Sequence, residues 1–101
     1  MNKRKGLTMK VVNKSKGEYY TVYIGRGSIF GNPYIIGRDG TREDVVAKYE
    51  IYARNLPIIM KAIGQLKEND ILGCFCKPLA CHGDVIIKLW KEIHYNAKTD
   101  N

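Results

Sequence analysis

The segment at residues 73–85, GCFCKPLACHGDV, holds the side chains of this chain that are best suited to chemistry. All 3 cysteines and one of the 2 histidines fall within the nine positions 74–82. Thiols and an imidazole this close together can bind a soft metal, attack a substrate or line a ligand pocket. We take the ligand pocket as the leading interpretation and a metal site as the second.

A zinc site would draw on Cys74, Cys76, Cys81 and His82. Cys74 and Cys76 are two residues apart, so on a strand their side chains point to the same side. Structural zinc sites, however, usually combine two cysteine knuckles that a longer segment separates. This chain offers C-x-C-x4-C-H without a second knuckle, and neighbouring Cys81 and His82 need an awkward turn to share one ion. The sequence therefore favours no cofactor, with zinc as the alternative.

The candidate catalytic residues are Cys81, His82 and Asp84. Cys81 lies at the start of a predicted helix, where the helix dipole and free N–H groups lower the pKa of a thiol. His82 could act as acid or base, and Asp84 is close enough in sequence to orient it. Cys74 and Cys76 are best explained as small apolar residues packed beneath a helix. Because paired carboxylates and a complete triad are missing, binding without turnover is favoured over catalysis.

The same helix start is a natural cradle for an anion, because unpaired N–H groups and the positive end of the helix dipole meet there. Gly83 would let a ligand approach the backbone closely, since glycine has no side chain. His82 could donate a hydrogen bond to a phosphate, and Asp84 could accept one from a ribose hydroxyl. Capping of the helix is the alternative role of Asp84.

A second unusual segment, GRGSIFGNPYIIGRDG at residues 25–40, is a long loop with five glycines. Loops of this length inside a small domain are usually functional. Its guanidinium groups suit a phosphate, its hydroxyl and amide groups suit hydrogen bonding, and its rings suit stacking on a base. The candidate ligand-binding residues are Arg26, Ser28, Phe30, Asn32, Tyr34 and Arg38 of this loop, together with His82, Gly83 and Asp84.

Several elements must position these two segments. Residues 9–13 and 18–24 are rich in β-forming side chains and predict two strands joined as a hairpin. Thr41 in the sequence TRED predicts a helix start with a capping box, and Pro57 starts a second helix as its first residue. Residues 71–76 predict a buried strand, and residues 82–95 predict a helix with an apolar stripe.

The order β-β-α-α-β-α predicts an α/β fold, a small sheet of about three to four strands covered by three helices. We expect a single domain over residues 1–101, with frayed termini at residues 1–8 and 96–101. In α/β sheets, ligands bind beyond the carboxyl ends of the strands. Both unusual segments follow a predicted strand, so we expect them to meet at that edge.

The composition is that of a soluble globular chain, with 45% hydrophobic and 27% charged residues. No apolar stretch is long enough to cross a bilayer, and no signal-peptide core follows the basic N-terminus. We therefore expect no membrane partner and a cytoplasmic location with reduced thiols, in the host cytoplasm if a phage encodes the chain. The net charge of +7 admits nucleic acid as a partner. Lysines on solvated helix faces explain this charge better, so nucleic acid is not the favoured partner.

Three ordered motifs resemble the domain of unknown function 4326 family of phages and bacteria: GRGSIFGNPY, GRDGTREDVVAKYE and GCFCKPLACHGDVI. The resemblance covers about residues 20–93. Gly27 stands where the family pattern has proline, and Phe30 stands where it has tryptophan. The resemblance implies that the loop and the CHGD segment belong together, and that the chain has a phage origin. It also implies an accessory role against host defence or in nucleotide metabolism.

We therefore hypothesise a small phage-like accessory protein that binds a nucleotide-derived anion, either ADP-ribose-like or a cyclic nucleotide. By binding it, the protein would sequester a host defence signal. A hydrolase or transferase acting on a nucleotide or nucleoside is one alternative, and a module that binds nucleic acid or a host protein is another. A second copy of the chain could complete the pocket, which would make a homo-oligomer the functional unit.

Overall fold

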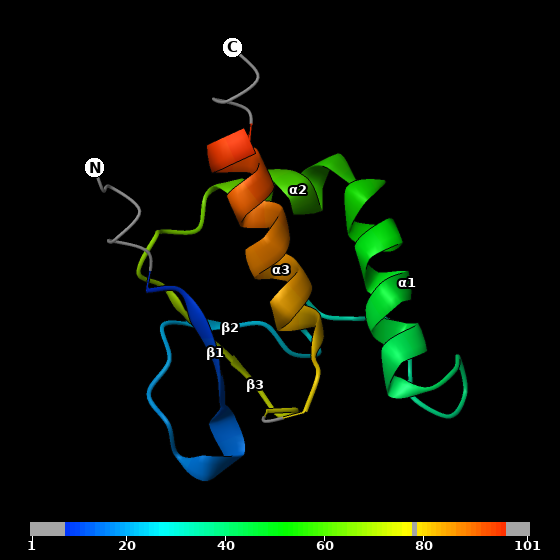
Figure 1. The fold of residues 1–101 in the computed structure, drawn as a ribbon. Helices are drawn as coiled ribbons and strands as arrows, with labels where there is room; N and C mark the ends of the chain where they lie inside the picture. Colours follow the sequence, from blue (N-terminus) through cyan, green and yellow to red (C-terminus); the bar gives the residue numbers. More distant parts are fainter. Residues whose placement is uncertain (1–7, 78, 97–101) are drawn as a thin grey trace.

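A parallel sheet of three strands forms one layer of the fold (Figure 1). The computed structural model of the chain describes residues 8–77 and 79–96. The strands are β1 (Lys10–Asn13), β2 (Val22–Tyr23) and β3 (Ile71–Cys74), in the spatial order β1-β3-β2. The predicted frayed termini, residues 1–8 and 96–101, lie outside the described residues except for residues 8 and 96.

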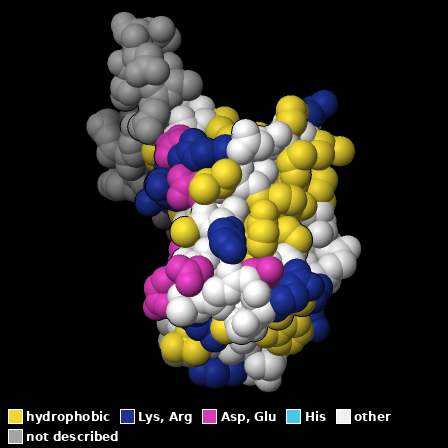
Figure 2. All heavy atoms as spheres, turned by 90° about the vertical axis from the view of Figure 1, so that its right-hand side faces the viewer, with side chains coloured by type: hydrophobic (Ala, Val, Ile, Leu, Met, Phe, Trp, Pro, Cys, Tyr) yellow, Lys and Arg dark blue, Asp and Glu magenta, His cyan; other side chains and the backbone are white. Residues whose placement is uncertain are grey.

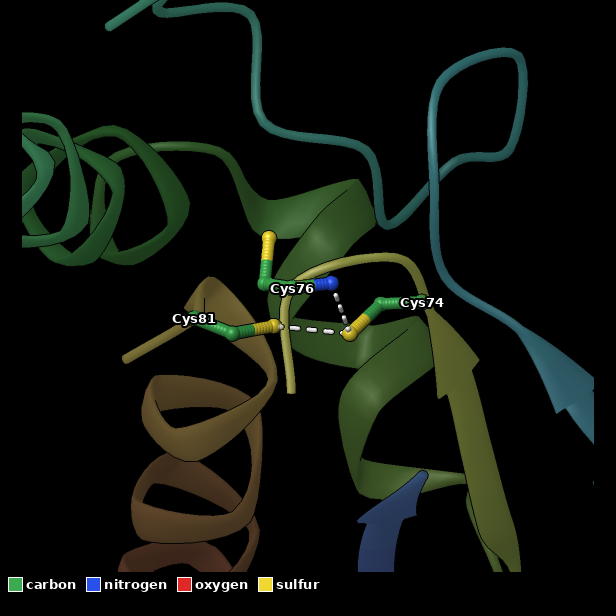
Figure 3. A group of neighbouring side chains, drawn as sticks. All are labelled: Cys74, Cys76 and Cys81. Atoms are coloured by element: carbon green, nitrogen blue, oxygen red, sulfur yellow. Dashed lines mark hydrogen bonds between the residues drawn. The ribbon is translucent and has the colours of Figure 1, made fainter. Parts of the chain in front are cut away.

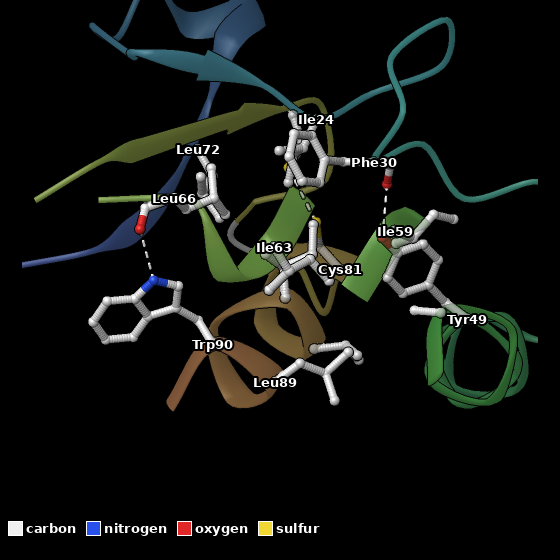
Figure 4. Packing of buried hydrophobic residues seen from close by; sticks show 14 of the residues in the cluster. Ile24, Phe30, Tyr49, Ile59, Ile63, Leu66, Leu72, Cys81, Leu89 and Trp90 are labelled. Atoms are coloured by element: carbon white, nitrogen blue, oxygen red, sulfur yellow. Dashed lines mark hydrogen bonds between the residues drawn. The ribbon is translucent and has the colours of Figure 1, made fainter. Parts of the chain in front are cut away.

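Three helices form the second layer (Figure 4). They are α1 (Arg42–Arg54), α2 (Pro57–Gly64) and α3 (His82–Lys91), and α3 continues into a π-helical turn, Glu92–Asn96. Helix α3 packs against β1 and against both other helices. The mixed α/β class with a small sheet and three helices is the predicted one and is confirmed. None of the helices among the described residues has the length and apolar character that a membrane span requires.

The predicted hairpin of the first two strands is wrong. β1 and β2 each pair in parallel with β3, which lies between them. The intervening Lys14–Lys16 segment is a 3-10 turn that ends at Gly17 in the left-handed conformation (φ 76°). Residues 17–21 then return the chain to the amino edge of the sheet, so that β2 runs parallel to β1 instead of pairing with it as a hairpin. β3 takes the central place because it is the most buried strand, whereas the expected strand at residues 18–24 shrinks to two half-buried residues.

Local signals place the helix starts as predicted. Thr41 Oγ1 accepts a hydrogen bond from Asp44 N at 3.1 Å, and Asp44 Oδ2 accepts one from Thr41 N at 2.9 Å. These two bonds form the capping box of α1. Hydrogen bonding of the Asp44 carboxyl to the backbone N–H and then to the side chain of Thr41 lowers its pKa. Pro57 is the first residue of α2, where its missing N–H costs nothing.

The core lies between the sheet and the helices (Figure 4). Ile24, Leu72 and Leu89 are fully buried there, from the end of β2, from β3 and from α3. Two buried polar groups find partners across elements. Trp90 Nε1 donates to Leu66 O at 2.8 Å, and Tyr49 Oη donates to Phe30 O at 2.9 Å. The second bond holds the long loop against α1, and so fixes one wall of the site.

Candidate functional site

A pocket of about 330 Å³ opens at the carboxyl edge of the sheet. We call it the strand-end pocket. Its walls come from the long loop after β2, from the first turn of α1 and from the segment that joins β3 to α3. The lining residues are Gly25, Arg26, Asn32, Tyr34, Ile35, Ile36, Arg42, Val45, Val46, Cys74, Phe75, Cys76, Ala80, Cys81 and His82. The two segments singled out in the sequence therefore meet, at the edge where parallel strands end.

Two arginines supply the positive charge of the strand-end pocket. Arg26 Nη1 donates to Asn32 O at 3.3 Å, and Arg42 Nη1 donates to Ala80 O at 3.1 Å. A guanidinium group has several more N–H donors, so each arginine retains donors for an anion. No carboxylate lines the pocket among the described residues. The wall is therefore electrostatically suited to a phosphate or a carboxylate.

Asn32 and Tyr34 shape the wall that the loop contributes. Asn32 Nδ2 donates to Val45 O at 3.0 Å, while Asn32 Oδ1 accepts from Tyr34 N at 2.9 Å. The Tyr34 ring meets Tyr52 edge-on with 6.1 Å between centroids, and Lys48 Nζ lies 5.8 Å from its centroid. Asn32 therefore anchors the loop to α1, and Tyr34 presents a braced aromatic ring to the pocket.

Three predicted loop residues lie elsewhere. Phe30 offers no face for stacking, because it is only 8% exposed and packs in the core. Arg38 lies outside the pocket, on the surface, and pairs with Asp39 at 2.8 Å. Ser28 Oγ donates to Gly25 O at 2.8 Å and lines a separate hollow of about 240 Å³ beside the pocket. Arg26 and Asn32 line both hollows.

Gly83 and Asp84 serve the fold at the start of α3. A Cβ atom at Gly83 would lie 2.7 Å from Val11 Cγ2 and 2.9 Å from Ile24 Cδ1, so this glycine lets α3 approach the sheet. Asp84 Oδ2 accepts from Cys81 N at 3.3 Å, and Asp84 Oδ1 pairs with Lys77 Nζ at 2.8 Å. Neither residue lines the strand-end pocket. For Asp84, the geometry corresponds to the capping alternative.

His82 is buried at the back of the pocket. Its Nε2 lies 2.7 Å from Ile24 O, a contact that requires Nε2 to carry the proton because a carbonyl oxygen only accepts. The ring also meets Tyr49 edge-on at 4.9 Å, and burial lowers the pKa of His82. The only N–H of the neutral imidazole thus donates to Ile24 O, which leaves no N–H for a phosphate in this arrangement.

The three cysteines cluster on the wall of the pocket. Cys74 ends β3, Cys81 caps α3, and Cys76 lies in the segment between them (Figure 3). Their sulfur atoms all lie within 4.8 Å of one another, which is metal-binding distance. The Cys74 and Cys81 sulfurs are 3.1 Å apart and share a hydrogen bond. The bond from Cys81 lowers the pKa of Cys74 to about 6, whereas the same contact and burial raise the pKa of Cys81.

The cluster changes the roles predicted for the thiols. Cys81 was the candidate nucleophile, since it lies at a helix N-terminus. It is instead a buried cap whose sulfur accepts from Gly83 N at 3.2 Å, and its proton is held between two sulfurs. Cys74 is the thiol that favours ionisation, although the sequence suggested only packing for it.

Comparison with known proteins agrees with the motif pattern. A sequence model described as "Domain of unknown function (DUF4326)" matches residues 8–92. The chain belongs to this family. The resemblance inferred from the three motifs is thereby confirmed. This DUF4326 chain is also 36% identical, over 89 residues, to the "Uncharacterized 12.4 kDa protein in nrdA-td intergenic region" of Enterobacteria phage T4. The alignment spans 80% of this chain and 76% of the phage protein, and no solved structure matches.

Two residues of this DUF4326 chain that shape the site are not among the candidates predicted from the sequence. In the sequence, Arg42 looks only like the first residue of a helix. Its position directly after the long loop is the feature that indicates a place in the pocket. Asn13 is buried at the end of β1, where its Nδ2 donates to Lys77 O at 2.6 Å. That bond fastens the cysteine segment to the sheet. A polar residue closing the apolar run MKVVN was the available sign.

Proposed function

We propose that this protein binds a nucleotide-derived anionic ligand in the strand-end pocket. One observation carries the proposal: Arg26, Arg42 and the ring of Tyr34 converge on a concave, carboxylate-free wall among the described residues. Guanidinium groups bind phosphates with two parallel hydrogen bonds, and an aromatic ring provides a face for a base. The remaining wall is largely apolar, as is usual for small-molecule sites.

The size of the pocket narrows the class of ligand. At about 330 Å³ it falls near the lower end of the range for small-molecule sites. This favours a ligand with one nucleoside, such as a cyclic nucleotide or an ADP-ribose-like molecule, over a dinucleotide. The adjoining hollow of about 240 Å³, which shares Arg26 and Asn32, offers room for a further phosphate or sugar.

The relative in Enterobacteria phage T4 supports a phage-like member of the family, and the accessory role is part of our proposal. We propose that the protein holds its ligand without converting it, and so withdraws a host signal from solution. The His82 N–H is engaged by Ile24 O and one N–H of Asn32 by Val45 O, while Asp84 caps a helix and pairs with Lys77. Few groups therefore remain in the pocket for acid–base chemistry. Zinc, the alternative cofactor, is not needed for this proposal.

The first prediction concerns the two pocket arginines. We expect isothermal titration calorimetry against AMP, cyclic AMP, ADP-ribose and inorganic phosphate to find at least one ligand for the unaltered protein. Arg26→Ala and Arg42→Ala should each weaken that binding by about 10- to 100-fold, because a hydrogen bond to a charged group contributes about 1.5–3 kcal/mol.

Arg38→Ala is the matched control, since Arg38 belongs to the same loop but lies outside the strand-end pocket. It should bind as the unaltered protein does. Absence of binding across the whole panel, or equal losses in all three variants, would contradict the proposal.

An enzyme that acts on a nucleotide or nucleoside is the second candidate function. It is favoured by the lowered pKa of Cys74 on the pocket wall. Chromatography of the bound ligand after long incubation separates the two readings. Ligand recovered unchanged supports sequestration, whereas product that disappears with Cys74→Ala would establish catalysis.

A further inference from the structure

The three thiols of the strand-end pocket form a better site for a metal than for apolar packing. Cys74 and Cys81 face each other across the junction of β3 and α3, while Cys76 points to one side (Figure 3). All three side chains line the pocket, and Cys76 is half-buried in an irregular segment. Packing under a helix would explain two buried cysteines, but it gives no reason for a third sulfur to lie within 4.8 Å of them.

We propose that Cys74, Cys76 and Cys81 bind one zinc ion as thiolates, and that the fourth coordination position faces the strand-end pocket. Thiolates select zinc and copper(I) among the common biological metals. Three protein ligands with one exchangeable position are the arrangement of zinc sites that take part in chemistry or ligand binding. The inference does not depend on which organic ligand the pocket holds.

The sulfur positions can accept the ion after a small shift of Cys74 and Cys81 and a rotation of the Cys76 side chain. Zinc–sulfur bonds of about 2.3 Å in tetrahedral geometry place sulfur atoms about 3.8 Å apart. The Cys74 and Cys81 sulfurs are 3.1 Å apart, and all three lie within 4.8 Å of one another. Rotation of the half-buried Cys76 side chain would bring its sulfur to face the other two (Figure 3).

Hydrogen bonds from the backbone already orient two of the sulfurs. Cys74 Sγ accepts from Cys76 N at 3.4 Å, and Cys81 Sγ accepts from Gly83 N at 3.2 Å. In both cases the donor lies two residues beyond the cysteine. Such outer-shell bonds hold thiolate ligands in place and offset their charge. The arginines of the pocket offset it further, since three thiolates and one zinc ion leave a net negative charge.

His82 is the competing fourth ligand, and the geometry argues against it. Its Nδ1 lies 3.8 Å from Cys81 Sγ and carries the lone pair, but His82 is not part of the group whose ligand atoms all lie within 4.8 Å. The bond to Ile24 O and the contact with Tyr49 hold the ring in place. The fourth position therefore goes to a water molecule or to a ligand in the pocket.

Zinc content and cobalt(II) spectroscopy test the proposal. We expect the reduced, full-length protein to retain one zinc ion per chain after desalting. Replacement by cobalt(II) should give a sulfur-to-cobalt charge-transfer band and intense tetrahedral d–d bands. Adding azide, a small exogenous ligand, should shift the d–d bands because the fourth position is exchangeable. A protein that takes up neither metal after reduction, and merely loses two hydrogens as a disulfide in air, would overturn the proposal.

Variants connect the signal to the three thiols. Cys76→Ser should weaken zinc binding by at least about 100-fold, since loss of even an outer-shell partner costs 10- to 100-fold. Cys81→Ser should do the same while keeping a side chain that can cap α3. Leu79→Ser, an exposed change in the same segment, should bind zinc normally. Circular dichroism confirms that each variant folds.

Two further results would overturn particular parts of the proposal. In one, the cobalt d–d bands do not shift when azide is added and are absent from His82→Gln. This would show a closed site with His82 as the fourth ligand and no exchangeable position. Zinc binding that survives both Cys76→Ser and Cys81→Ser would place the metal elsewhere. Neither result bears on nucleotide binding, which calorimetry of the Arg26 and Arg42 variants tests separately.

Discussion

Single residues at the start of α3 combine several duties. Cys81 caps the helix, shares a proton with Cys74 and lines the pocket, all from one buried sulfur. Gly83, two residues on, allows the helix to lie close to the sheet. The sequence pointed to Cys81 correctly as a helix-start residue, because capping depends on near neighbours. It could not reveal the role of Gly83, because the atoms that exclude a side chain there belong to Val11 and Ile24, far away in the chain.

Gly83→Ala should therefore lower the free energy of unfolding without acting directly on ligand affinity. The added methyl group would overlap Val11 and Ile24 side chains, and overpacking of this kind costs about 1–3 kcal/mol. Urea denaturation followed by circular dichroism measures the change in the free energy of unfolding.

Gly64→Ala in α2 is the matched control: its methyl group would make ordinary contacts with Ile93 at 3.6 Å. It should raise stability by about 0.5–1 kcal/mol. Equal effects at both positions would contradict the close-approach argument.

At the scale of elements, helices α1 and α3 are joined by charged groups as well as by apolar packing. Glu50 accepts from Arg54 within α1 at 2.7 Å and pairs with Lys88 of α3 at 3.0 Å. Arg54 also reaches Glu92 at 2.9 Å. The helix starts at Thr41 and Pro57 were predictable because their signals are local. The network was not, since Lys88 and Glu50 become neighbours only after the helices pack.

Glu50→Gln should lower stability in a pH-dependent manner. Hydrogen bonds from Arg54, then from Lys88, hold the pKa of Glu50 below its usual value of 4.5 in the folded state. A carboxyl group with a lowered folded pKa stabilises the protein above its unfolded pKa, and this contribution disappears as the pH falls through the folded pKa. We expect a loss of about 0.5–1 kcal/mol at pH 7 that vanishes well below pH 4.5.

Thermal denaturation across a pH series gives the comparison. Glu68→Gln makes the same change of charge at an exposed residue that forms no ion pair within the described part of the chain. It should leave stability nearly unchanged at every pH. A Glu50→Gln effect that stays constant down to pH 3 would exclude the electrostatic explanation.

For the whole molecule, one hydrophobic cluster connects the sheet, the helices and the loop that carries the site. The charged side chains, in contrast, do not gather into one cluster of a single sign on the face shown in Figure 2. On the face shown in Figure 2, acidic side chains lie beside Lys and Arg, and hydrophobic side chains gather in a patch next to them. Exposed Ile51 and Ile58 are both 65% accessible. Nucleic acid and a second copy of the chain are therefore proposals for partners. The two arginines of the strand-end pocket are a more specific feature than this mixed surface, and they favour a small anionic ligand.

A single core predicts a single unfolding transition. Trp90, the one tryptophan of the chain, is 4% exposed and bonded to Leu66 O, so its fluorescence reports on core packing. We expect tryptophan fluorescence and far-ultraviolet circular dichroism to give coincident urea curves. Arg42→Ala, at the pocket rim, should keep the two curves coincident. A fluorescence change that precedes the loss of helix would indicate a separately unfolding part.

The predicted α/β class is confirmed, whereas the predicted pairing of the first two strands is wrong. Hydrophobic periodicity identified the helices and the buried strand, because each pattern reports the immediate environment of its own residues. The hairpin error arose because the partner of a strand is chosen by burial across the whole sheet. Phe30 illustrates the same limit: as part of a polar, glycine-rich loop it suggested exposure, yet Tyr49 holds its backbone and the core takes its ring.

The central place of β3 also sets the order in which the protein can assemble. Both outer strands belong to the first quarter of the chain, and both depend on Ile71–Cys74 for their hydrogen bonds. On the ribosome, β1 and β2 therefore emerge long before the strand that joins them. The sheet forms only once residues 71–74 have been made, and the pocket at its edge only once His82 has followed them. A nascent chain that stops before residue 71 has neither.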